Sequence, residues 1–152
     1  MKRFKIVLVL LMTSFILSCN TDRDDLDLTE AEANELNNIA KTGDWKISEY
    51  TLNGSENTAN YADYVFNFEE SNNLTAKSSI DEVLGTWRAS NDSGDEYDPY
   101  DDLDFHIFFS STSKLGELAN NYDILAATDK EIRLILGENA NGDAATLIFS
   151  KN

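Results

Sequence analysis

Short runs of alternating apolar and polar residues fill the chain from Trp45 to Lys151. A period of two is typical of β-strands that bury one face. Eight runs follow this pattern, at Trp45–Leu52, Asp63–Glu69, Leu74–Ser79, Gly85–Ser90, Asp104–Ser110, Tyr122–Thr128, Glu131–Leu136 and Ala145–Lys151. Turn-forming residues separate most of them, and a link as short as TDK (128–130) allows only antiparallel neighbours. The pattern therefore predicts an all-β fold, an eight-stranded antiparallel up-and-down barrel, since closure leaves no exposed sheet edge.

The alternation also predicts which side chains point into the barrel. Large apolar residues occupy every second position of four runs, so that each set shares one face. These sets are Tyr64, Phe66 and Phe68; Phe105, Ile107 and Phe109; Ile132, Leu134 and Leu136; and Leu147 and Phe149. An eight-stranded barrel has an interior just wide enough for its own side chains or for one small ligand.

A helical period precedes the strands. Thr29 is a suitable N-cap with Glu32 completing a capping box, and Gly43 is a suitable stop signal. Ala33, Leu36 and Ala40, with Ile39 beside them, form one apolar stripe. We therefore expect a short N-terminal helix from Thr29 that covers one end of the barrel.

The N-terminus has the pattern of a signal peptide. Three basic residues among the first five precede a predominantly apolar stretch of 12 residues, Ile6–Leu17, which is too short to cross a bilayer. Ser18 and Cys19 follow, and the stretch Ile-Leu-Ser-Cys resembles a bacterial lipobox. As the only cysteine, Cys19 cannot form a disulfide within the chain, and beside an apolar signal segment it lacks a base for catalysis. We expect residues 1–18 to be removed and Cys19 to be lipidated, with plain secretion or an uncleaved anchor as the alternatives.

The net charge of the chain limits its possible partners. The chain has a net charge of −16, and residues 1–18 contain three of its 12 basic residues and none of its 28 acidic ones, which leaves −19 on the mature part. Such a surface repels phosphate backbones and anionic headgroups, so nucleic-acid binding is excluded and the protein would be held at the membrane only through acyl chains on Cys19.

We expect residues 19–28 to form an acidic tether and residues 29–152 to form the folded domain. The tether also resembles the surface-export signal of Bacteroidetes lipoproteins, although a solvated linker has the same composition.

Two Gly-x-Trp motifs suggest a family. Gly43 and Trp45 open the first predicted strand, and Gly85 and Trp87 open the fourth. Together with the YVFNF and LDFHIFFS strands, their order resembles the lipocalin-like domain of Bacteroidetes lipoproteins over residues 41–151. The resemblance implies that Trp45 and Trp87 close the barrel or contact a ligand. In lipocalins an arginine near the C-terminus packs over the tryptophan, and Arg133 is the nearest candidate here.

The sequence offers little catalytic chemistry. His106 is the sole histidine and points away from Phe105 and Ile107, so nucleophile–base pairs and typical zinc sites lack residues. The segment Asn91–Asp104 contains seven acidic residues, which suits weak calcium binding or a solvated loop, but its spacing is not that of an EF-hand. We expect no enzyme activity, no cofactor, no catalytic residue and no metal site.

Two functions from different classes remain open. The first is a lipid-anchored outer-membrane lipoprotein, exposed on the cell surface if the tether is an export signal, whose barrel interior or mouth binds a small hydrophobic ligand. The second is a non-catalytic structural or interaction lipoprotein with a filled barrel and outer-membrane protein partners. The side chains that point inward separate the two: if Phe66, Phe109, Leu134, Phe149 and both tryptophans fill the interior, an internal pocket is lost.

Overall fold

The computed structural model describes residues 21–91, 103–110, 114–137 and 142–151. The predicted signal peptide, Cys19 and most of the acidic segment Asn91–Asp104 lie outside these residues. The described helices are α1 (Thr21–Lys41) and the 3-10 helices η1 (Thr58–Tyr61), η2 (Glu70–Asn72) and η3 (Lys114–Leu118). The strands are β1 (Trp45–Leu52), β2 (Ser55–Glu56), β3 (Val65–Phe68), β4 (Asn73–Lys77), β5 (Glu82–Asn91), β6 (Leu103–Phe108), β7 (Asn120–Ala127), β8 (Glu131–Leu136) and β9 (Ala145–Lys151).

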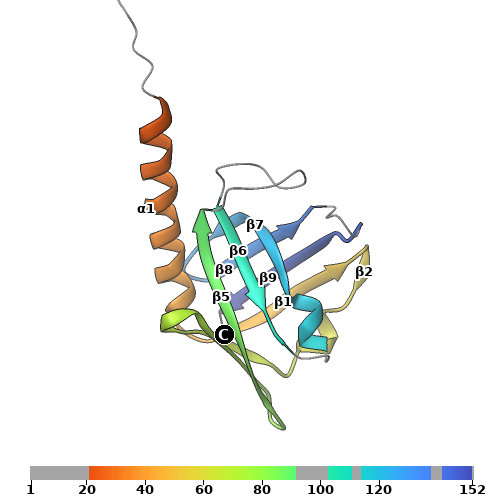
Figure 1. Cartoon of the computed structure of the whole chain (residues 1–152). Helices are drawn as coiled ribbons and strands as arrows, with labels where there is room; N and C mark the ends of the chain where they lie inside the picture. Colours follow the sequence, from red (N-terminus) through yellow and green to blue (C-terminus); the bar gives the residue numbers. More distant parts are fainter. Residues whose placement is uncertain (1–20, 92–102, 111–113, 138–141, 152) are drawn as a thin grey trace, which may run out of the picture.

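The strands close into an antiparallel up-and-down barrel (Figure 1). From β3 to β9 each strand pairs with the next along the chain, and β9 pairs with β1 from Trp45↔Lys151 to Leu52↔Ala145. The circle is completed where β1 meets β3, through the pair Trp45↔Phe66. Eight strands thus form the wall, as predicted, while the two-residue β2 only extends a hairpin from the end of β1.

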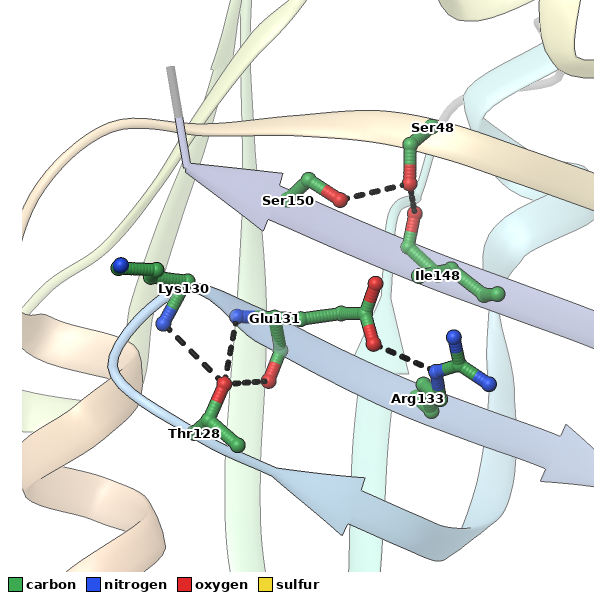
Figure 2. Close-up of polar contacts among 7 residues, drawn as sticks. All are labelled: Ser48, Thr128, Lys130, Glu131, Arg133, Ile148 and Ser150. Carbon is green, nitrogen blue, oxygen red and sulfur yellow. Dashed lines mark hydrogen bonds and ion pairs between the residues drawn. The ribbon is translucent and has the colours of Figure 1, made fainter.

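Strand boundaries follow the sequence pattern closely. β1, β8 and β9 have the predicted bounds, and the remaining wall strands differ from the prediction by a few residues at their ends. The TDK link is a tight turn between β7 and β8, in which the Thr128 hydroxyl accepts hydrogen bonds from the backbone N–H groups of Lys130 and Glu131 over 3.3 and 3.0 Å (Figure 2). A threonine side chain that binds the backbone two and three residues ahead stabilises such a turn.

The helix is longer than predicted. It begins at Thr21 instead of Thr29, so the expected capping box at Thr29 is wrong and residues 21–28 of the expected tether are helical. This stretch contains neither Gly nor Pro, and acidic residues are favoured near a helix N-terminus, which explains why the helix extends back. The C-terminal stop is confirmed, because Gly43 follows the last turn with a φ of 105°. None of the helices in the described part of the chain has the length and apolar character that a membrane crossing requires.

The apolar stripe of α1 lies against one end of the barrel. Ala33, Leu36 and Ala40 are buried, and Leu36 and Ala40 belong to the same core as the inward residues of the strands. Asn37 fixes this position, since its side-chain amide donates to Ala33 O within the helix and to Ala89 O of β5. The predicted cover of the barrel end by the N-terminal helix is therefore present.

Candidate functional site

Large side chains fill the barrel interior. The six residues that decide between an internal pocket and a filled barrel each expose only 0–3% of their surface; they are Trp45, Phe66, Trp87, Phe109, Leu134 and Phe149. Phe68 packs among them, with its ring centroid 5.2 Å from Trp87, 5.4 Å from Phe105 and 5.3 Å from Phe149. These edge-to-face contacts are those that aromatic rings favour in a packed core. A ligand in the interior would have to displace these rings.

Trp45 connects the barrel to the helix. Its indole N–H donates to Ala40 O over 2.8 Å, and its side chain is fully buried. The Lys151 ammonium lies 5.0 Å from the centroid of its ring, which is a favourable cation–π distance. Trp45 is thus part of the structure that closes one barrel end.

Arg133 does not pack over Trp45, and the prediction for this residue is wrong. Its side chain is exposed on β8 and its Nε atom pairs with Glu131 Oε1 over 2.5 Å (Figure 2). The physical reason is the alternation of β8: Ile132 and Leu134 point inward, so Arg133 must point outward. Lys151, at the end of the last strand, supplies the cation instead.

Trp87 lies deeper in the same end of the barrel. Its indole N–H donates to Glu69 O over 3.1 Å, and its ring centroid is 5.6 Å from that of Phe105. The neighbouring Gly85 leaves space for Phe109, because a Cβ atom at this position would lie 2.6 Å from the Phe109 ring. Both tryptophans therefore satisfy their indole N–H groups with backbone carbonyls.

Three tyrosines close the opposite end, and the sequence reasoning missed them. Tyr50 donates to Glu117 O, Tyr61 to Lys114 O and to the Glu117 carboxylate, and Tyr122 to Leu118 O. These bonds hold η3 over the barrel, and Leu115 and Leu118 of η3 are buried. Burial, followed by the nearby Glu117 charge, raises the pKa of Tyr50 to about 12, and burial raises the pKa values of Tyr61 and Tyr122 further.

Open space occurs where α1 crosses the ends of β6 and β7. A half-open groove of about 410 Å³ lies there, within the range of about 300–1,000 Å³ that is usual for small-molecule sites. Five of its eight described lining residues are apolar: Leu36 and Ile39 from α1, Leu103 from β6, and Ile124 and Ala127 from β7. This groove is the best candidate for a binding site.

The other three described lining residues are acidic. Glu32 and Glu35 line it from α1, three residues apart and therefore neighbours on the helix surface. Asp123 lines it from β7, and pairs across the β6–β7 ladder with Asp104, which exposes only 2% of its surface. No basic residue is found among the described residues that line the groove.

A second groove, of about 440 Å³, surrounds the C-terminal end of α1. Its described lining is polar apart from Gly43 and Phe68, and includes Lys41, which forms an ion pair with Glu70. It therefore suits a hydrophobic ligand less well than the first groove.

The remaining chemical candidates do not assemble into a site. His106 is half-buried on the outer face of β6, as the alternation predicts, and lies in register between Arg88 and Asn121. Within the described ranges, no group of three or more His, Cys, Asp or Glu side chains converges enough to hold a metal ion.

Comparison with known proteins gives one structural likeness. No family model matches the chain, and no curated protein matches it. Among solved structures, the chain is similar to a lipocalin-like protein from Bacteroides uniformis, with 13% sequence identity and a TM-score of 0.44 over 74% of this chain and 99% of that one. The closed eight-stranded barrel itself follows from the strand pairing.

Proposed function

We propose that this protein is a lipid-anchored lipoprotein of the outer membrane, and that it binds a small hydrophobic ligand at the rim of its barrel. The observation that supports ligand binding is the groove between α1, β6 and β7, whose described lining is mostly apolar. The side chains that fill the interior favour the rim over the inside of the barrel as the ligand site. The proposed role is non-catalytic, since one histidine and one cysteine leave typical nucleophile–base pairs incomplete.

Native mass spectrometry tests the ligand on the whole chain, extracted from the membranes of its own cells. We expect the wild-type protein to carry a co-purified small molecule. Ala127→Trp places an indole in the groove and should remove that molecule, whereas Ala126→Trp on the neighbouring exposed position should retain it. A wild-type protein without any ligand, or an Ala127→Trp variant with the same ligand, would contradict the proposal.

The anchor is tested separately at Cys19. Cells that make the wild-type chain should incorporate radiolabelled fatty acid into it, and cells that make Cys19→Ala should not. Label on the variant, or its absence from the wild type, would contradict lipidation at Cys19 without bearing on the groove.

The second candidate function is a structural or interaction role in the envelope. The filled interior favours it, and so do exposed apolar side chains on the outer surface of the β4–β5–β6 region, where Ile80 is 92%, Leu84 69% and Phe108 48% exposed. Under this function the mass spectrum would show no ligand, and the chain would co-purify with a protein instead.

A further inference from the structure

We propose that the groove between α1, β6 and β7 selects a cationic amphiphile, a small molecule with an apolar chain and an ammonium group. This inference rests on the proposed function and specifies the ligand class of the same site. The partly exposed apolar residues of its lining, Ile39, Leu103 and Ile124, would contact the chain of such a molecule, and the lining carboxylates would attract its charge.

The positions of the carboxylates support a positive ligand. Glu32 and Glu35 approach from the helix, and Asp123 approaches from the barrel, so negative charge lines both walls of the groove. Glu32 and Glu35 are exposed to water, and a neutral ligand that covered them would remove this water without replacing it, which is costly for a charged group. An anionic ligand would add direct repulsion to that cost.

The spacing of these groups favours an organic cation over a bare metal ion. A metal ion needs several ligands within about 2–2.6 Å, and in the described part of the chain no three acidic or histidine side chains converge in this way. A groove whose lining combines apolar side chains with carboxylates that do not converge instead suits a bulky ammonium group attached to a hydrocarbon chain.

The charge of the whole molecule acts in the same direction. With a net charge of −16, the chain attracts cations and repels anions at long range, which raises the local concentration of a positive ligand at its surface. The same property explains why a cationic ligand would bind less tightly as salt concentration rises.

Three probes with one chain length and different head groups test this selection. Octyltrimethylammonium, octanol and octanoate are titrated by calorimetry into the full chain held in lipid nanodiscs, with empty nanodiscs as the blank. We expect affinity to fall in the order cation, neutral, anion. We also expect the cation to lose affinity between 20 and 200 mM salt while octanol does not, on the basis of ordinary screening.

Variants locate the selection in the groove. Glu32 and Glu35 are exposed, so the double variant E32Q/E35Q should fold, and we expect it to bind octyltrimethylammonium about tenfold more weakly and octanol unchanged. The control D63N/D129N removes the same charge from exposed positions outside the groove lining and should leave both affinities close to wild type. Equal affinity for all three probes, or equal loss in both double variants, would overturn the cation selection but leave the apolar groove. If none of the three probes binds, the proposed function is overturned as well.

Discussion

At the scale of single residues, the two Gly-x-Trp motifs owe their glycines to different causes. Gly43 has a φ of 105° and ends α1, so it is needed for its backbone conformation. Gly85 has no such φ, but Phe108 O would lie 2.4 Å from a Cβ at this position and the Phe109 ring 2.6 Å from it. The first motif therefore has a glycine because a helix ends there, and the second because the Phe109 ring packs closely against the backbone.

This difference predicts the effect of adding one methyl group at Gly85. Gly85→Ala should destabilise the protein by about 1–3 kcal/mol, because the new Cβ overlaps a backbone oxygen that cannot move freely. The free energy of unfolding is measured by urea denaturation. Gly137→Ala is the matched control, since nothing lies within 4 Å of a Cβ there. Equal stability of the two variants would contradict the close approach of Phe109 to Gly85.

At the scale of elements, the candidate site depends on the position of α1. It forms one wall of the groove and is held to the barrel by its apolar stripe, by the Trp45 indole bond to Ala40 O and by the Asn37 amide bond to Ala89 O. Fixing this helix therefore also fixes the groove.

Removing the Asn37 amide should loosen α1 without unfolding the barrel. Asn37→Ala removes a bond within the helix and a bond to β5, each worth about 0.5–1.5 kcal/mol. We expect faster hydrogen exchange of the α1 amides and unchanged exchange in β8 and β9. Asn38→Ala is the control, because its side chain is exposed on the same helix. Faster exchange in every element of Asn37→Ala would show instead that helix and barrel unfold as one unit.

The tyrosines that hold η3 predict a loss of stability in alkali. Below pH 10 they are protonated in both folded and unfolded chains; above it the unfolded chain loses phenol protons that Tyr50 keeps to about pH 12. Because the pKa of Tyr50 is higher in the folded state, the free energy of unfolding falls as the pH rises through this range. Tyr50 should account for about 2 kcal/mol of this loss at pH 12. Urea denaturation from pH 9 to 12 measures this, and Tyr50→Phe should show a smaller decline. The same pH dependence in both proteins would contradict the role of Tyr50.

The elements also show how far the sequence could be interpreted. Regular alternation identified the strands and the inward faces of β8 and β9, because burial on one face imposes a strict period. It does not predict the register shift between Ile47 and Glu49, which places Tyr50 in the core where alternation expects Glu49. The groove could not be predicted either, because it depends on where α1 lies relative to β6 and β7 and on no local pattern.

At the scale of the whole molecule, the start of α1 and the β4–β5 hairpin lie at opposite ends (Figure 1). The 21 residues of α1 extend over about 30 Å, and Thr21 is two residues beyond Cys19. An anchor at Cys19 would therefore leave the hairpin on the side away from the membrane. Ile80 lies in the turn of this hairpin and is 92% exposed.

Because of this arrangement, labelling of a cysteine at position 80 should show on which side of the outer membrane the barrel lies. Cys19 is the only cysteine, and lipidation would consume its sulfur, so Ile80→Cys would contain the only free thiol. If the protein is anchored to the cell surface, a membrane-impermeant maleimide should label this variant on intact cells. Ala76→Cys is the control: it lies in the same hairpin but is fully buried, so it should stay unlabelled while the barrel is folded. Labelling of Ile80→Cys only after the outer membrane is opened would place the barrel inside the envelope, and the ligand of the groove would then be sought in the periplasm.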